Sequence, residues 1–277
     1  MTRNRLLLLA AAFLFSTGGA AIKATTLTSW QVAAFRSGVA AIALALLLPE
    51  SRRLRGARVP AVGAAYAATM VLFVTANKLT TSANAIFLQD TAPLYLMLLG
   101  PWLLKERLRG RDVALAAVVA GGMALFFLGS ERAVATAPDP ARGNLVAAAS
   151  GLAWALTISG LRWARASGMA PVLAGNLIAC AAALPMALPV AHFGARDAAA
   201  VVYLGVVQIG LAYVCVTRAI RHVPAFEASL VLLAEPALNP LWAFLVHGER
   251  PSAWAVAGGA LILGATVAAS RSVGEKG

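Results

Sequence analysis

An acidic residue stands inside one of the long apolar runs of this sequence. Glu235 lies within the run 225–246 and is followed by Pro236, Asn239 and Pro240. Proline has no amide hydrogen, so two backbone carbonyls of a helix at this point would lack their usual partners. A carboxylate beside free carbonyls can bind a cation or a proton. The alternative is that Glu235 is protonated and hydrogen-bonded to a neighbouring helix.

A second acid lies in an earlier apolar run, 83–104. Asp90, with Gln89 before it, stands within one helical turn of Pro93, much as Glu235 precedes its own proline. A charged side chain at the centre of a membrane helix costs about 2.5–3.5 kcal/mol, so it is expected to face a cavity or a partner. Withdrawal from water favours the protonated form of a carboxyl group. Either acid could therefore load and release a proton.

Two cations lie in the part of the chain that should share the depth of Asp90. Arg36 is inside the run 30–48, and Lys78 follows the run 59–76. A guanidinium binds a carboxylate through two parallel hydrogen bonds, and an ammonium acts as a point charge. Either cation could bind the carboxylate of a ligand, but a structural ion pair with Asp90 is the alternative for both. Lys78 could also end a helix with its ammonium extended to the interface.

Aromatic and polar side chains could complete a pocket around these charges. An apolar or aromatic ligand needs a largely apolar pocket with a few oriented polar groups. The candidates at middle depth are Phe15, Phe87, Tyr95, Trp154, Tyr203, Gln208, Tyr213 and Trp242. Each ring could equally pack between helices or face lipid.

Ten apolar stretches must position these residues. The chain has 277 residues, of which 60% are hydrophobic and 12% charged, with a mean hydropathy of +0.79, beyond the range of a soluble domain. Each stretch is near the ~20 residues that a helix needs to cross a bilayer, and none shows the strict alternation of a barrel strand. We therefore predict an all-α integral membrane protein with spans at 6–22, 30–48, 59–76, 83–104, 113–128, 145–161, 172–190, 198–216, 225–246 and 254–269.

The second half of the chain repeats the first. A shift of 143 residues superposes several paired residues, and a shift of 139 does so nearer the starts of the halves. The first shift pairs Ala76 with Ala219, Lys78 with Arg221, Pro93 with Pro236, Glu106 with Glu249, Arg107 with Arg250 and Gly121 with Gly264, and the second pairs Phe15 with Trp154 and Lys23 with Arg162. Internal symmetry of this kind is typical of transporter folds. It predicts a first repeat over 1–128, a linker over 129–143 and a second repeat over 144–277.

The distribution of Lys and Arg predicts the orientation. With the N-terminus inside, the cytoplasmic segments hold sixteen Lys and Arg residues and the outer segments hold six, which places both termini in the cytoplasm. Five spans per half is an odd number, so the two repeats have inverted orientations. The net charge of +12 follows from this bias toward the inside, and we expect no nucleic-acid partner.

These features resemble the EamA family of the drug/metabolite transporter superfamily. The resemblance is carried by the two five-helix halves, the turns ANKLTTSANAIFL and TRAIRHVPAFEASL, the paired prolines, and the Glu-Arg helix ends at Glu106 and Glu249. Within the family, the chain is most similar to exporters of aromatic amino acids in the bacterial inner membrane. The resemblance implies a basket of helices around a central cavity that opens alternately to each side, and export of small metabolites.

Two other functions are alternatives to amino-acid export. The same scaffold could export or exchange other metabolites or drugs. An intramembrane enzyme is disfavoured because His192, His222 and His247 lie at span ends and the sequence has no HExxH, CxxC or GxSxG motif. We expect no cofactor and no metal. The expected partners are a small-molecule substrate, the lipid bilayer and, if transport is coupled, protons; facilitated diffusion is the other possibility.

Overall fold

The computed structural model describes residues 3–92, 94–95, 110–128, 134–219, 222, 231–232 and 234–274. Within these ranges the chain is helical, and the one β-bridge joins Val134 and Ala137. The first half contains α1 (Arg3–Ser16), α2 (Gly18–Lys23), α3 (Ser29–Leu47), α4 (Arg58–Leu79), α5 (Ser82–Gln89) and α7 (Gly110–Leu128). The second half contains α8 (Pro140–Trp163), α9 (Ala170–Ala187), α10 (Ala195–Val202), a π-helical segment (Tyr203–Leu211), α11 (Ala212–Ala219), α13 (Ala234–His247) and α14 (Ala253–Gly274).

The helices are long and apolar enough for a multi-pass membrane protein. Within the described residues, six helical spans could cross a bilayer by length and composition, when α1 is counted with α2 and α10 with the π-helical segment and α11. Two shorter apolar helices lie within α7 and α14. Eight of the ten predicted spans coincide with helices of the structure. The fourth and ninth predicted spans, 83–104 and 225–246, run into residues outside the described ranges, so the count of ten stays a prediction. Pro93, Glu106 and Arg107 also lie outside those ranges.

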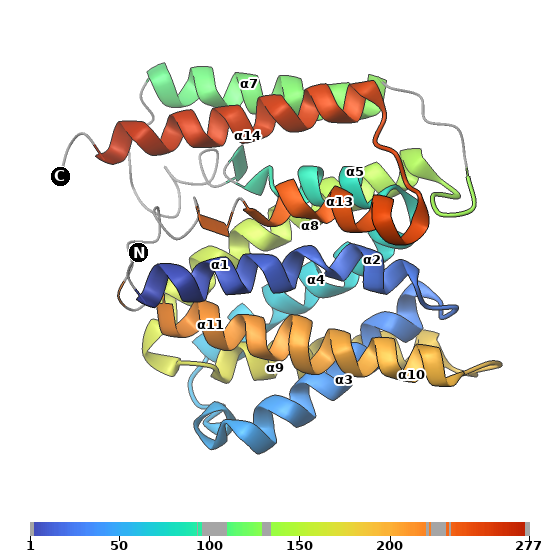
Figure 1. Cartoon of the computed structure of the whole chain (residues 1–277). Helices are drawn as coiled ribbons and strands as arrows, with labels where there is room; N and C mark the ends of the chain where they lie inside the picture. The colour runs from blue at the N-terminus through green and yellow to red at the C-terminus, as the bar shows by residue number, and fades with distance from the viewer. Residues whose placement is uncertain are drawn as a thin grey trace.

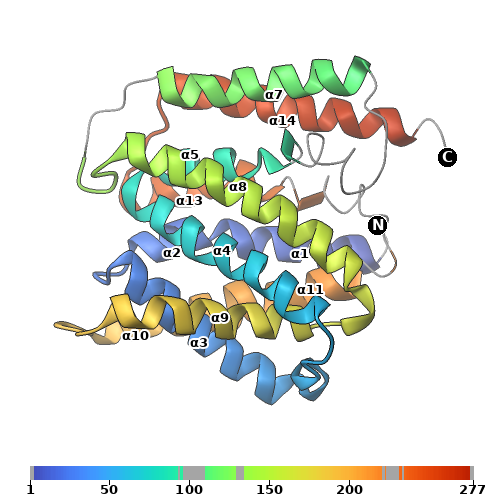
Figure 2. The same ribbon diagram turned by 180° about the vertical axis from the view of Figure 1, so that it is seen from behind.

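The helix axes run roughly side by side, and α7 and α14 form a pair at one edge (Figures 1 and 2). Helix α1 begins and α14 ends at the same end of the bundle, so the described chain starts and ends there. The two halves of the sequence are interleaved, because the most extensive packing joins helices from different halves: α4 with α8 and α9, α3 with α9, and α1 with α11.

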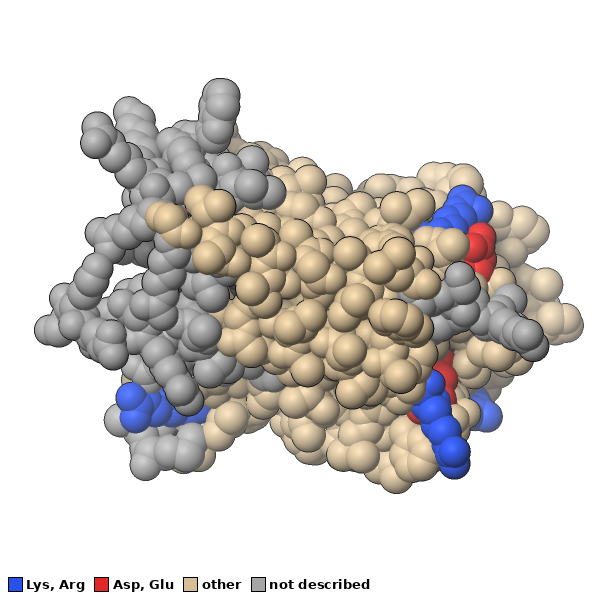
Figure 3. All heavy atoms as spheres, turned by 90° about the horizontal axis from the view of Figure 1, so that it is seen from above, with Lys and Arg blue, Asp and Glu red and all other residues tan. Residues whose placement is uncertain are grey.

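Charge and apolar surface are separated along the bundle. On the face shown in Figure 3, the described Lys, Arg, Asp and Glu residues gather toward the two ends, and a belt without charge lies between them. Large apolar side chains are also exposed on the helices, among them Leu46, Leu128 and Leu245, with 62–68% of their surface accessible. An apolar belt between charged ends is the surface expected against lipid.

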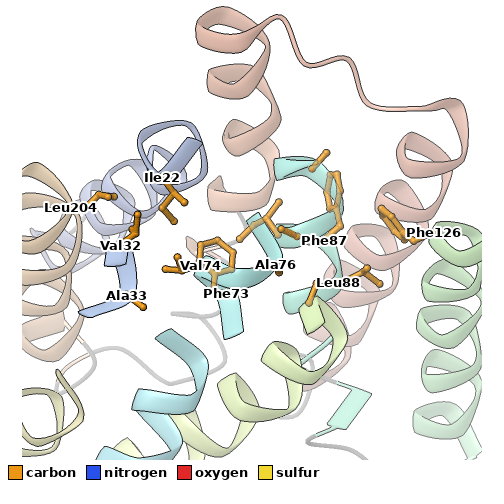
Figure 4. Close-up of a cluster of buried hydrophobic side chains, with 14 of the residues drawn as sticks. Ile22, Val32, Ala33, Phe73, Val74, Ala76, Phe87, Leu88, Phe126 and Leu204 are labelled. Atoms are coloured by element: carbon orange, nitrogen blue, oxygen red, sulfur yellow. The ribbon is translucent and has the colours of Figure 1, made fainter. Parts of the chain in front are cut away.

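The interior is packed by small and apolar side chains from both halves. One buried cluster runs from Leu204, Ile22 and Val32 through Phe73 to Phe87 and Phe126 (Figure 4). Glycine permits some of the closest approaches. A Cβ atom on Gly205 would lie 2.8 Å from the carbonyl oxygen of Arg36, so only glycine lets the π-helical segment lie this close to α3.

Two helices begin with side-chain caps at the end of the bundle opposite the termini. The Thr28 side chain accepts a hydrogen bond from the amide of Gln31, and the Gln31 side chain accepts one from the amide of Thr28. Thr81 caps α5 in a similar way through the amide of Asn84. Such caps satisfy amides that a helix leaves without partners in its first turn, and they fix the starts of α3 and α5.

Candidate substrate-binding cavity

A small cavity, with a volume of about 30 Å³, lies between the two halves. Helices α1, α3, α4, α5, α8, α11 and α13 and the π-helical segment all contribute to it. Its walls are Phe15, Arg36, Thr69, Met70, Phe73, Gln89, Trp154, Gln208, Ile209, Tyr213 and Glu235. Six of the twelve residues proposed from sequence for substrate binding or coupling therefore meet in one place, together with Phe15.

Residues related by the sequence repeat face the same cavity. Phe15 and Trp154 correspond under the shift of 139, and Met70 and Tyr213 correspond under the shift of 143. Because both members of each pair line the cavity, it lies at the junction of the repeats. Substrate sites of transporters built from inverted repeats are found at this junction.

Arg36 supplies a buried cation to the cavity wall. Its side chain is 1% exposed, and its Nη2 donates to the carbonyl oxygen of Met70 at 2.9 Å. Its Nε has no hydrogen-bond partner. Among the residues that the structure describes, no carboxylate lies within 4.0 Å of the guanidinium. The ion pair with Asp90, which the sequence left open, is therefore not formed.

Two tyrosines, Tyr66 and Tyr213, lie near Arg36. The rings of Tyr66 and Tyr213 lie 5.1 Å apart in an edge-to-face arrangement, and Phe15 packs on Tyr213 at the same distance. Asn176 donates to the Tyr66 hydroxyl at 3.1 Å. Edge-to-face pairs are the favoured geometry of buried rings, so this cluster forms a firm aromatic wall beside the cation.

The π-helical segment aims polar atoms at the cavity. Gln208 lies in it, and its Nε2 is 3.5 Å from the carbonyl oxygen of Phe15, while its Oε1 has no partner within the described residues. The sequence predicted an ordinary helix over 198–216 and did not predict this segment. The only local signal was Gly205 and Gly210, which flank Gln208. Such π-helical turns occur frequently at functional sites.

Two carboxyl groups approach the cavity from different halves. Glu235, in the first turn of α13, is half-buried and lines the cavity. Asp90 follows α5 directly, and its Oδ2 is fully enclosed without a partner among the described residues. The two groups are close enough to interact electrostatically, and Glu235 also interacts with Tyr213. The acids that the sequence singled out thus share one region of the protein interior.

Three other proposed rings lie away from the cavity wall. The Tyr203 hydroxyl is 2.8 Å from the Thr17 hydroxyl, and Tyr95 donates to the carbonyl oxygen of Ala148 at 2.9 Å. Trp242 donates to the Ser16 hydroxyl at 2.9 Å. Each of these side chains joins two helices. Phe87, which the sequence also suggested as a lining residue, packs against Phe126 in the apolar cluster instead.

Lys78 lies at the end of the bundle opposite the termini, outside the cavity. Its Nζ donates to the carbonyl oxygen of Thr25 at 2.9 Å and contacts the Thr25 hydroxyl at 3.1 Å. The next residue, Thr26, donates from its amide and its hydroxyl to Asp197, both at 2.8 Å. Lys78 therefore lies in the last turn of α4 and holds the turn between α2 and α3.

The same end contains an ion pair between the halves, which we call the latch. Lys23 Nζ lies 2.6 Å from Glu249 Oε1, with the two side chains only 3% and 7% exposed. Lys23 also donates to the carbonyl oxygens of Thr80 (2.8 Å) and Thr136, and Glu249 Oε2 accepts from the amide of Ser82 at 2.9 Å. The sequence marked Glu249 as a Glu-Arg helix end but did not identify Lys23 as its partner. The position of Lys23 at the end of a predicted span was the available signal.

Comparison with known proteins agrees with this architecture. The model of the EamA-like transporter family matches residues 4–128 and 141–271. No curated protein matches the chain significantly, whereas 23 chains of solved structures do. One crystal structure has a TM-score of 0.64 at 22% sequence identity and covers 98% of each chain, a likeness that concerns the fold. The two matches of the family model span both repeats, and the chain therefore belongs to the EamA-like transporter family, whose members are multi-pass membrane transporters of small molecules.

Proposed function

We propose that this chain is a secondary transporter that exports aromatic or other neutral amino acids across the bacterial inner membrane by alternating access. In this proposal both termini are cytoplasmic, and the latch lies at the outer end of the bundle. The membrane location and the amino-acid substrate rest on the resemblance described above and on the chemistry of the cavity.

The observation that carries the proposal is the buried guanidinium of Arg36 in the cavity wall, which has a carbonyl partner in Met70 but no carboxylate partner among the described residues. Leaving a buried charged group without a partner costs several kcal/mol (roughly 3–5 when an ion pair is broken). A ligand carboxylate would supply the missing partner through charge-assisted, bidentate hydrogen bonds. This favours a substrate that bears a carboxylate over a purely cationic drug.

The rest of the cavity suits the other parts of an amino acid. Glu235 offers a negative charge for an α-ammonium group, and Gln89 and Gln208 offer polar atoms that can accept or donate. The remaining wall is mostly aromatic and aliphatic, with Phe15, Phe73, Trp154 and Tyr213 as its rings. Such a wall fits an apolar or aromatic side chain.

Energy coupling is proposed at the two acids. Glu235 could exchange an ammonium group for a proton, with Asp90 as its electrostatic neighbour. A proton gradient would then drive export, because the site would bind substrate from one side and a proton from the other. Facilitated diffusion, without any coupling ion, is the competing possibility.

Transport by purified protein in liposomes tests the proposal. Vesicles loaded with radiolabelled phenylalanine should lose it faster when an inward-directed proton gradient is imposed, and tryptophan and tyrosine should compete. Two analogues test separately whether the carboxylate and the ammonium of phenylalanine are recognised. Phenethylamine lacks the carboxylate, and 3-phenylpropionate lacks the ammonium. Each should compete at least about tenfold more weakly than phenylalanine, since each leaves one charge of the site unpaired.

Three results would count against parts of the proposal. Competition by phenethylamine as strong as that by phenylalanine would show that Arg36 does not bind the substrate carboxylate. A transport rate that does not depend on the proton gradient would indicate facilitated diffusion. No movement of phenylalanine by folded protein would exclude aromatic amino acids and leave another metabolite or drug as the cargo.

A further inference from the structure

Two fully buried polar residues lie behind the cavity wall, next to Arg36. They are Tyr66 of α4 and Asn176 of α9, each at 0% exposure. Tyr66 lies near Arg36, and its ring packs edge-to-face on Tyr213 with the ring centres 5.1 Å apart. Arg36 and Tyr213 line the cavity, whereas α9, which the structure describes in full, contributes no residue to the cavity wall. Asn176 can therefore affect a bound ligand only through its neighbours.

The side chain of Tyr66 is held at both ends by α9. The amide nitrogen Nδ2 of Asn176 donates to the Tyr66 hydroxyl at 3.1 Å and to the carbonyl oxygen of Val172 at 2.9 Å. Each of the two amide hydrogens thus has an acceptor, which fixes the orientation of the amide. At the other end of the ring, a Cβ atom on Gly175 would lie 2.7 Å from Cγ and 2.8 Å from Cβ of Tyr66. Only glycine leaves room for the ring at this point.

The guanidinium of Arg36 depends on such neighbours for its orientation. Met70 is its hydrogen-bond partner, with Nη2 of Arg36 2.9 Å from the carbonyl oxygen and 3.5 Å from Sδ. Nε of Arg36 has no partner among the described residues. A carboxylate forms two parallel hydrogen bonds only with a guanidinium that lies in the matching plane. A binding group must be held in that geometry by the packing around it, and Tyr66 and Tyr213 are the rings that lie beside Arg36.

The sequence repeat pairs the support with the cation. Under the shift of 139, Gly175 is the counterpart of Arg36. Any side chain at position 175 would enter the space of the Tyr66 ring. The second half thus leaves room, at the position where the first half has its cation, for a ring that packs beside that cation.

We propose that Tyr66, held by Gly175 and Asn176, is a positioning residue that keeps the Arg36 guanidinium in the plane that binds the substrate carboxylate. This proposal rests on the transport function proposed above. It adds that recognition of the carboxylate depends on α9, a helix that does not contribute to the cavity wall.

Ligand affinities of the purified protein in detergent test the positioning role. Tyr66→Phe removes the hydroxyl that Asn176 holds and keeps the ring. We expect the affinities for phenylalanine and 3-phenylpropionate to fall about five- to tenfold, because both ligands carry a carboxylate, while the affinity for phenethylamine changes less than about twofold. Tyr203→Phe is the matched control, since the Tyr203 hydroxyl contacts Thr17 away from the cavity wall. No loss in Tyr66→Phe, or an equal loss for all three ligands, would overturn the proposal.

A double-mutant cycle tests whether Asn176 acts through Tyr66. Asn176→Leu should weaken phenylalanine binding about three- to fivefold in the unmodified chain. In the Tyr66→Phe background it should have an effect of less than about twofold, because the hydroxyl that it holds is already absent. Equal effects of Asn176→Leu in the two backgrounds would show that Asn176 does not act through Tyr66, and the proposed support would be wrong.

Chemical modification of Arg36 tests the same role without any assumed substrate. The protein is treated with the small arginine reagent 2,3-butanedione, and modification of Arg36 is followed by mass spectrometry, with exposed Arg53 as the internal reference. Arg36 should react several-fold faster in Tyr66→Phe than in the unmodified protein or in Tyr203→Phe. If the unmodified protein binds none of the three ligands, the amino-acid proposal fails, and the modification rate alone decides the positioning role. Equal rates in Tyr66→Phe and the unmodified protein would overturn it.

Discussion

The two halves of the chain place some uncharged cavity residues at corresponding positions but place charges at positions that do not correspond. The ring of Phe15 matches that of Trp154, and Met70 matches Tyr213. Arg36 has no basic counterpart, because shifts of 139 and 143 lead to Gly175 and Ala179. Glu235 has no acidic counterpart either, since the shift of 143 leads back to Ala92.

This difference separates what the fold needs from what a ligand needs. An inverted repeat requires apolar shapes that pack against their own copies, and matched residues provide them. An amino acid has no such symmetry, because its carboxylate and ammonium lie on one side of its apolar side chain. A site for an amino acid therefore requires charges that have no counterpart in the other half. Arg36 of the first half and Glu235 of the second half are such charges.

Removing the first-half charge should have the largest effect on ligand binding. Arg36→Met should weaken phenylalanine binding about 100-fold, because the carboxylate loses a charge-assisted bidentate partner in a buried site. Arg36→Lys should restore part of the affinity as a point charge. Binding is measured by equilibrium binding to purified protein, with Arg53→Met at an exposed position as control. Equal affinities of all three variants would show that the ligand does not bind at Arg36.

Removing the second-half charge should have the next largest effect and should change the pH response. Glu235→Gln keeps the shape of the side chain but cannot exchange a proton, so the pH dependence of transport should disappear and the rate should fall about tenfold. Transport is measured in liposomes over a series of pH values. Glu50→Gln, at an exposed helix end, should keep the profile of the unmodified protein. A retained profile in Glu235→Gln would assign the proton elsewhere, with Asp90→Asn as the next variant.

The sequence predicted the scaffold and part of the cavity for one physical reason. Apolar runs of membrane length and a repeat are visible in a linear pattern, and a charge inside such a run, as at Arg36 or Glu235, marks a site because burial in lipid is costly. Rings carry no such mark. Trp154 and Trp242 look alike in sequence, yet Trp154 lines the cavity and Trp242 bonds to Ser16.

Other features depended on contacts between distant segments. The partner of Glu249 is Lys23, more than 200 positions earlier in the chain, and no local pattern joins them. The polar side chains packed against Gly19 of α2 likewise come from three other helices, α4, α5 and α13. The π-helical segment packs closely against α3, where Gly205 approaches Arg36. Periodicity and composition report single helices, so these features follow only from the packed structure.

Both residues of the latch have counterparts in the sequence repeat, Arg162 for Lys23 and Glu106 for Glu249. Variants of the latch therefore test whether residues matched by the repeat control access to the cavity instead of recognition of the substrate. Lys23→Met leaves Glu249 buried without its cation, which should destabilise the closed state by roughly 3–5 kcal/mol. Transport should change about fivefold through easier opening, with phenylalanine affinity in detergent less affected. The double variant Lys23→Met/Glu249→Gln should recover most of the lost thermal stability, because no unpaired charge remains. Equal melting temperatures of the single variant and the unmodified protein would show that the pair does not hold this end closed.

Exchanging the matched rings should have the smallest effect. In Phe15→Trp/Trp154→Phe the two halves trade side chains while the total volume of the cavity wall is kept, so transport should stay within about threefold of the unmodified protein. The single variant Trp154→Ala should lose more, because it removes a ring without replacement. Phenylalanine transport and competition by tryptophan are measured for each variant. A loss in the exchange variant as large as that of Arg36→Met would mean that each ring holds a specific part of the ligand. The rings would then belong with the charges as asymmetric recognition elements, and the division between a symmetric wall and asymmetric charges would fail.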